Sequence, residues 1–163
     1  MNLSEKKHSI GIDLGSSSVK MTLFNLLNGE NIDTVTYPQK EMKIESPKKD
    51  WAEQDPQLWW NCVKECFYFL KKRNNLQSVI SIGISYQMHG LVAIDDNGDI
   101  LFPSIIWCDS RAIKIGEDAN KKLSKSLISD HLLNSPGNFT ASKLRWVKEN
   151  NLNGYSSIYK FML

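Results

Sequence analysis

The sequence has few cysteines, no excess of one sign of charge and no long apolar run, and each of these absences excludes a class of protein. Three cysteines among 163 residues, with no Cys-x-x-Cys pair, support neither a disulfide framework nor a structural zinc site. Lys and Arg number 20 against 18 Asp and Glu, so the net charge is only +2 and no basic field points to nucleic acid. No apolar run is long enough for a membrane span. The partner to expect is a small molecule.

The overall composition is that of an ordinary globular protein, with 41% apolar and 23% charged residues. A length of 163 residues predicts one domain with one core. The polar start of the chain lacks the apolar stretch of about 7–15 residues that a secretory signal needs, which favours the cytoplasm. The chain stops inside the apolar run 158–163, which indicates a piece of a longer chain.

The first part of the chain has the pattern of a sheet. Apolar residues alternate with small or polar ones over residues 9–15 and again from Val19, and Asn28-Gly29 marks a turn before a third run at 32–37. Three short strands with tight connections predict an antiparallel meander. Residues 38–51 have no sustained period and predict a surface loop, either a lid or a connector.

A helix and a further strand follow this meander. Asp55-Pro56 is a typical helix start, because Asp accepts from unpaired N–H groups and Pro suits the first helical position. Apolar residues then share one helical face that includes Cys62 and Cys66, which we expect to be buried as small hydrophobes. The strand pattern at 79–85 predicts a crossover onto the same sheet. Isoleucines line one face of that strand, and the small residues of the other face would let a helix pack closely.

The second half of the chain predicts shorter elements. Residues 91–102 have the pattern of a β-hairpin with a glycine in its loop. One helix is predicted from near Asp109 to Leu123, and another over 140–150 after a turn at Pro136-Gly137.

A carboxylate stands at the end of the first strand, in Asp13-Leu14-Gly15-Ser16-Ser17-Ser18. Such a loop can offer backbone N–H groups and hydroxyls to a phosphate, while the carboxylate holds the hydration shell of Mg²⁺. The segment is not a Walker loop, which requires G-x-x-x-x-G-K-[ST]. The alternative is a plain hairpin with a polar turn.

Two further segments carry side chains that suit a sugar. Gln87-Met88-His89-Gly90 follows a predicted strand, where loops can line a crevice, and it combines hydrogen-bonding groups with an adaptable apolar wall. The alternative is a histidine satisfied within a polar loop. Trp107 and Asp109 place an aromatic plane beside a carboxylate, and the alternative there is a buried Trp followed by an Asp N-cap.

Segments 10–20, 51–60, 83–92 and 105–111 together resemble the N-terminal domain of the FGGY family of carbohydrate kinases, and the likeness continues through 138–146. The resemblance implies an α/β fold of the actin-like ATPase (ribonuclease-H-like) type, with a mixed sheet, an antiparallel three-strand meander and crossover helices. It implies that residues 1–163 are a single domain, the N-terminal lobe of a two-lobe sugar kinase whose C-terminal nucleotide lobe is absent from this chain.

The resemblance also implies an activity. Kinases of this family move the γ-phosphoryl group of ATP, with Mg²⁺, to a sugar hydroxyl. The expected sugar is a ketopentose, D-xylulose first. The alternative within the family is another FGGY carbohydrate kinase, of the ribulose, gluconate or glycerol type. The resemblance leaves a homodimer open. The principal base, an Asp, is expected in the missing lobe, so the 163-residue chain alone is expected to be inactive.

Roles are implied for particular side chains. Asp13 would support catalysis by positioning Mg²⁺ through water. The residues implied at the ATP phosphates are Gly15, Ser16, Ser17 and Lys20. The residues implied at the sugar are Gln87, Met88, His89, Trp107 and Asp109.

Two positions depart from the family pattern, since Tyr86 and Cys108 stand where Gly and Asn are usual, so the sugar pocket would differ in shape. The alternative from another class is a non-catalytic actin-like binding module, whose Gln87–Gly90 loop contacts a partner protein. The kinase interpretation requires Asp13 and His89 to open onto one hollow.

Overall fold

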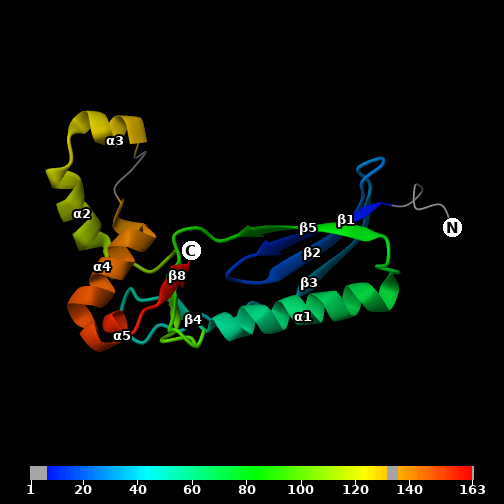
Figure 1. The fold of residues 1–163 in the computed structure, drawn as a ribbon, viewed down its shortest axis with the longest axis horizontal. Helices are drawn as coiled ribbons and strands as arrows, with labels where there is room; N and C mark the ends of the chain where they lie inside the picture. Colours follow the sequence, from blue (N-terminus) through cyan, green and yellow to red (C-terminus); the bar gives the residue numbers. More distant parts are fainter. Residues whose placement is uncertain (1–6, 132–135, 163) are drawn as a thin grey trace. The chain divides into compact units, whose positions relative to one another are not determined.

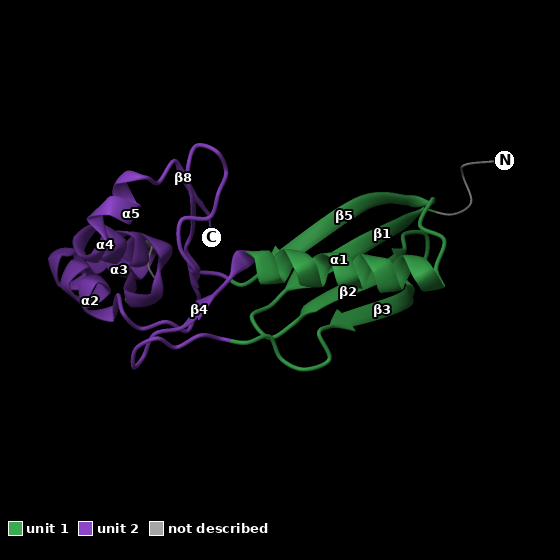
Figure 2. Ribbon diagram, turned by 90° about the horizontal axis from the view of Figure 1, so that it is seen from below, with its two compact units in different colours: residues 1–43, 57–87 green, residues 44–56, 88–163 purple. Residues whose placement is uncertain are grey.

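The structure is a computed structural model that describes residues 7–131 and 136–162. The chain divides into two units, coloured separately in Figure 2: unit 1 is residues 1–43 and 57–87, and unit 2 is residues 44–56 and 88–163. Each unit has its own buried apolar residues. The length predicted one domain with one core, and that prediction stays open beside these two compact units.

Unit 1 contains a four-stranded mixed sheet in the order β3-β2-β1-β5. Strands β1 (His8–Leu14), β2 (Val19–Asn25) and β3 (Asn31–Tyr37) are antiparallel neighbours, and β5 (Val79–Tyr86) runs parallel to β1. The predicted meander and the predicted return onto the same sheet are both confirmed.

Helix α1 (Pro56–Arg73) lies along one face of this sheet (Figure 1). Its buried residues are Trp59, Cys62, Val63, Cys66 and Leu70, the face that the periodicity predicted. The Cys66 thiol donates to the backbone carbonyl of Val19 at 3.5 Å, so the helix packs directly on β2. Both helical cysteines are buried, as expected of small hydrophobes.

The isoleucines of β5 are exposed. Ile80, Ile82 and Ile84 are 53–64% exposed. Parallel pairing matches Ile82 with Ile10, which is buried beneath α1. A helix about 10 Å wide covers only two or three strands spaced about 4.8 Å apart, so the edge strand extends beyond it. Contrary to the expected packing, no described helix covers the small-residue face of β5 either, since Ser81, Gly83 and Ser85 are exposed.

Unit 2 combines two small sheets with short helices. Its strand pairs are β4 (Glu53–Gln54) with β7 (Ser104–Ile105), and β6 (Val92–Ile94) with β8 (Lys160–Met162). Its helices are α2 (Ile113–Lys122), α3 (Lys125–His131), the 3-10 helix η1 (Pro136–Asn138), α4 (Thr140–Asn150) and α5 (Leu152–Ser156). Leu91, Ile105 and Val147 form the centre of its core.

One prediction for this unit needs correction, and two others are present in the structure. Helix α2 begins at Ile113 and not near Asp109, because both carboxylate oxygens of Asp109 bond to the 52 and 111 positions instead of capping a helix. The predicted hairpin is present but short: Ile94 and Ile100 form an antiparallel bridge, and the N–H groups of Asp95 and Leu101 donate to the carbonyls of Asp99 and Ala93 at 3.0 and 3.1 Å. Strand β6 additionally pairs with the C-terminal strand β8. The helix predicted over 140–150 is confirmed.

In the part of the chain that the structure describes, none of the helices combines the length and the apolar character needed to cross a membrane.

Candidate functional site

The carboxyl ends of β1 and β5 meet at one edge of the unit 1 sheet. Leu14 pairs with Tyr86, and the backbone N–H of Gln87 donates to the Leu14 carbonyl at 3.1 Å. Asp13 precedes this point, has an exposed side chain and is the register partner of Lys20 on β2. Four predicted positions, Asp13, Lys20, Gln87 and the loop that starts at Gly15, therefore lie at or near this edge.

The loop after β1 is tight. The Gly15 N–H donates to the Ser18 carbonyl at 3.1 Å, and a Cβ added to Gly15 would lie only 3.1 Å from that same oxygen. The Ser17 carbonyl accepts from the Met42 N–H at 2.8 Å, which fixes the loop from outside. Glycine is therefore the residue that this turn accommodates without displacement of its backbone.

This donor set fits the groups that a kinase would bring here. An exposed carboxylate and serine hydroxyls are hard oxygen donors of the kind Mg²⁺ prefers, and Mg²⁺ commonly keeps several waters and takes one or two carboxylates. The Lys20 ammonium would offset phosphate charge. Among the described residues, no group of three His, Cys, Asp or Glu side chains could hold a metal by itself. A water-mediated site at Asp13 needs no such group.

Gln87 has a buried amide that lacks partners. Its Nε2 and Oε1 atoms are both shielded from solvent, and neither forms a hydrogen bond within the described residues. An unpaired buried polar group costs about 1–3 kcal/mol, so native proteins rarely leave one unless a ligand or water completes it. The end of β5 thus holds a buried polar group whose hydrogen-bonding capacity the described residues leave unfilled.

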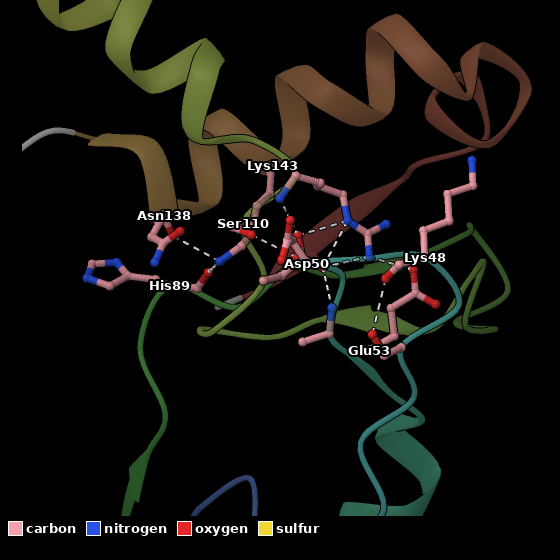
Figure 3. A network of polar contacts seen from close by, with 11 residues as sticks. Lys48, Asp50, Glu53, His89, Ser110, Asn138 and Lys143 are labelled. Carbon is pink, nitrogen blue, oxygen red and sulfur yellow. Dashed lines mark hydrogen bonds and ion pairs between the residues drawn. The ribbon is translucent and has the colours of Figure 1, made fainter.

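His89, in unit 2, has an unusual backbone conformation. Its φ is +64°, in the left-handed region that L side chains rarely adopt. Its ring stacks on Phe139 with centroids 4.6 Å apart and planes 16° apart. Lys143 Nζ donates to the His89 carbonyl at 2.5 Å, and Figure 3 shows the ring directed away from that contact. The backbone is thus bound on one side while the ring faces the other.

Met88 and Trp107 are the exposed members of this group, at 66% and 50%. An antiparallel bridge joins Leu91 to Ile105, two residues after His89 and two residues before Trp107. His89 and Trp107 therefore lie at the same end of this pair of segments.

Asp109 lies in the interior of unit 2. It is 0% exposed, and its Oδ2 accepts from the Ala52 N–H at 2.6 Å and from an Arg111 terminal nitrogen at 2.7 Å. The Arg111 guanidinium also reaches Glu53 at 2.7 Å and lies 3.7 Å from the centre of the Trp51 ring. Figure 3 shows this network joining the 50–53 segment to the 109–111 segment. The structure thus gives Asp109 a structural function, and its predicted contact with a sugar stays a prediction.

Burial governs the titration of the groups around Asp109. Burial lowers the pKa of Lys143 to about 8, and the nearby Asp109 carboxylate opposes that shift. Partial desolvation raises the pKa of the Cys108 thiol, although this residue lies at an exposed position. Lys143, Arg111, Asp109 and Glu53 carry two positive and two negative charges when all are ionised, so the cluster is neutral as a whole.

The sequence did not single out Lys143, Phe139, Thr140 or Arg111 as site residues. A signal for Lys143 exists, because it lies four residues before the buried Val147 and so shares the inner face of α4. A lysine on an apolar helical face marks a buried polar contact.

Three comparisons identify the class of protein that this architecture defines. The family model for the N-terminal domain of the FGGY family of carbohydrate kinases matches residues 8–163. The xylulose kinase of Escherichia coli (strain K12) is 34% identical over 154 residues, which cover 94% of this chain and 31% of that protein. The chain thus spans about 31% of that relative's length.

Solved structures agree with this result. A xylulose kinase from Brucella ovis superposes with a TM-score of 0.83 at 29% identity, covering 94% of this chain and 32% of that one. A gluconate kinase from Lactobacillus acidophilus gives a TM-score of 0.81 at 26% identity, covering 97% and 31%. This chain belongs to the FGGY family of carbohydrate kinases and matches its N-terminal domain. The predicted actin-like α/β fold with a mixed sheet is confirmed.

The predicted site residues thus form two groups. Unit 1 brings Asp13, the Gly15–Ser17 loop, Lys20 and Gln87 to one sheet edge, and unit 2 places Met88, His89 and Trp107 in neighbouring segments. That Asp13 and His89 open onto one hollow stays a prediction.

Proposed function

We propose that this chain is the N-terminal, sugar-binding lobe of a two-lobe kinase that transfers a phosphoryl group from ATP to a ketopentose, D-xylulose. The observation that carries the proposal is the loop at Gln87–His89. It joins an amide without partners at the end of β5 to an imidazole held in a strained backbone. The relatives that are 33–34% identical to the chain over most of its length and are named xylulose kinases support the choice of sugar.

The unit 1 edge supplies the phosphate side of this reaction. Bound MgATP would supply the phosphoryl group. The exposed Asp13 carboxylate would hold the hydrated Mg²⁺, and the Lys20 ammonium would balance phosphate charge. The Gly15 N–H is bound to the Ser18 carbonyl, so the hydroxyls and the other backbone N–H groups of this loop would be the donors to a phosphate.

Unit 2 supplies the sugar side. The stack on Phe139 fixes the plane of the His89 ring, and no described residue forms a hydrogen bond with its ring nitrogens. One nitrogen can therefore donate to a sugar hydroxyl and the other can accept. Met88 and Trp107 add exposed apolar surface suited to the C–H faces of a sugar. Only Met88 separates Gln87 from His89, so the Cα atoms of these two residues lie within about 8 Å of each other.

Calorimetric or NMR titration of the chain with D-xylulose tests the proposal. D-xylulose is expected to shift the resonances of residues 87–89 and of Trp107. The His89→Ala variant is expected to lose the response, and His8→Ala, which changes a histidine at the start of β1, should keep it. Saturating D-xylulose without any shift at residues 87–89 would contradict the proposal.

A second sugar class deserves the same titration, because the gluconate kinase from Lactobacillus acidophilus has a TM-score of 0.81. Gluconate differs from D-xylulose in carrying a carboxylate and no ketone carbonyl. Stronger binding of gluconate than of D-xylulose would assign the site to a sugar acid.

Turnover provides a separate test. The chain spans about 31% of its relatives' length, and the base of the family is expected outside it, so we expect no sugar-dependent ADP release from the 163-residue chain. Robust D-xylulose-dependent ADP release would show that the catalytic base lies within these residues.

A further inference from the structure

The first turn of α4 carries two side chains that bond to the backbone of the candidate sugar loop. Lys143 Nζ donates to the His89 carbonyl at 2.5 Å and to the Asn138 carbonyl at 2.9 Å. Thr140 Oγ1 donates to the Gly90 carbonyl at 2.8 Å. Two successive carbonyls of the loop are thus tied to one turn of one helix, as Figure 3 shows for Lys143.

The burial of Lys143 calls for a reason beyond packing. The residue is 0% exposed, and lysine is almost never fully buried unless its charge is paired or hydrogen-bonded. An apolar side chain of similar length would fill the same space without the cost of desolvating an ammonium. What only the lysine provides is the pair of hydrogen bonds to the carbonyls of His89 and Asn138.

The residue that receives this hydrogen bond is the one whose backbone needs support. His89 has a φ of +64°, and a residue other than glycine keeps a left-handed conformation only where its surroundings hold it. That conformation places the His89 ring on Phe139, which immediately precedes α4. Three contacts therefore join the start of α4 to this loop. Phe139 stacks on the His89 ring, Thr140 bonds to the Gly90 carbonyl, and Lys143 bonds to the His89 carbonyl.

We propose that Lys143 is a positioning residue of the sugar site: its ammonium, together with the Thr140 hydroxyl, holds His89 in the left-handed conformation that aims the imidazole at the sugar. The nature of the ligand rests on the proposed function, whereas the hold on His89 rests on the contacts alone.

The expected effect follows from the population of the aimed conformation. When the Lys143 hydrogen bond is removed, His89 can adopt ordinary backbone conformations. The apparent affinity for the sugar then falls in proportion to the fraction of chains whose His89 keeps the left-handed conformation. The left-handed conformation is disfavoured by about 1–2 kcal/mol for an L residue, which corresponds to a roughly 5- to 30-fold loss of affinity.

The test compares Lys143→Met with Lys148→Met, which changes an exposed lysine on the same helix. The first readout is the intraresidue HN–Hα NOE of His89, which is strong at positive φ. The second readout is the Kd for D-xylulose. Lys143→Met is expected to weaken the NOE and to raise the Kd roughly 5- to 30-fold, and Lys148→Met is expected to change neither.

The two readouts separate this inference from the proposed function. A wild-type chain that does not bind D-xylulose counts against the proposed function, while the NOE still decides whether Lys143 holds His89. A folded Lys143→Met chain with an unchanged NOE overturns the inference. If Lys143→Met does not fold, Thr140→Val, which removes only the hydroxyl contact, is expected to shift the resonances of His89 and Gly90, and their constancy would overturn it.

Discussion

Replacement of Arg111 by methionine tests the buried ion cluster of unit 2. The Arg111 side chain is 3% exposed, and its partners Asp109 and Glu53 are 0% and 15% exposed. The guanidinium contacts both Asp109 oxygens at 2.7–3.0 Å and one Glu53 oxygen at 2.7 Å. The variant keeps two carboxylates in the interior and removes the cation that compensates them.

The size of the effect follows from this burial. Removal of one partner from a buried ion pair typically costs about 3–5 kcal/mol, because the remaining charge is desolvated without compensation. An exposed pair contributes about 0.3–0.5 kcal/mol. The matched control is Arg145→Met, whose pair with Glu149 has exposures of 64% and 44% and lies in the same unit. We expect roughly a tenfold difference in destabilisation between the two variants.

Urea unfolding followed by circular dichroism and tryptophan fluorescence provides the assay. Trp51 reports on unit 2 directly, because Arg111 lies over its ring at 3.7 Å. A second variant, Arg111→Met with Asp109→Asn, should recover part of the lost stability, since it removes the uncompensated charge. A loss below about 1 kcal/mol for Arg111→Met, or no recovery in the double variant, would refute the reasoning.

Three further predictions concern protonation, thiol exposure and close packing. The pKa of Lys143 falls from 10.5 to about 8 on folding, so between these pH values the unfolded chain binds a proton that the folded chain has released. Over this pH range the free energy of unfolding of the wild type, relative to that of Lys143→Met, should rise by about 1–3 kcal/mol in urea titrations. Native protein should expose one reactive thiol to a disulfide reagent, Cys108, while Cys62 and Cys66 should react only in urea. Gly116→Ala should lower stability by about 2 kcal/mol or more in thermal unfolding, because the added Cβ would lie 2.2 Å from backbone atoms of η1.

Each of these predictions has an outcome that contradicts it. Burial raises the pKa of Cys66 to about 11, which lowers stability between pH 9.0 and about 11, so only the difference between wild type and Lys143→Met isolates the lysine. A difference that is flat with pH would contradict the lysine prediction. Rapid reaction of two or three native thiols would contradict the assigned burial. The control for Gly116 is Gly83→Ala, where a Cβ meets nothing within 4 Å, and equal stability of the two variants would contradict the packing argument.

The sheet and α1 could be predicted because their signals are local. The period-two alternation extends along each of β1, β2 and β3, and helical spacing extends along the face of α1 that carries Cys62 and Cys66. Several residues in each element therefore indicate the same structure. The short elements α3, α5, β4, β7 and β8 lack such repetition. Strands of two or three residues form where a partner segment is present, and a sequence pattern cannot show that partner.

The candidate site was predictable in its residue types and only partly in its geometry. A polar loop after a strand indicated Gln87, Met88 and His89, and the structure adds an unpaired amide and a left-handed backbone there. Asp109 had the same polar signal as Asp13, yet its carboxylate is fully buried while that of Asp13 is exposed. Charge and position in the sequence do not distinguish an exposed carboxylate from one paired in the interior.

The sequence by itself determined the strands of the unit 1 sheet, the long helix α1, the tight turn at Gly15 and the resemblance to a kinase family, since all of these depend on neighbours within a few residues or on ordered motifs. Only the tertiary structure decided which polar side chains are held by others. Lys143 meets His89 across 54 positions of the chain, and Asp109 meets Ala52 across 57. The free energy of a buried charge depends on partners that folding brings together, and no local pattern records those partners.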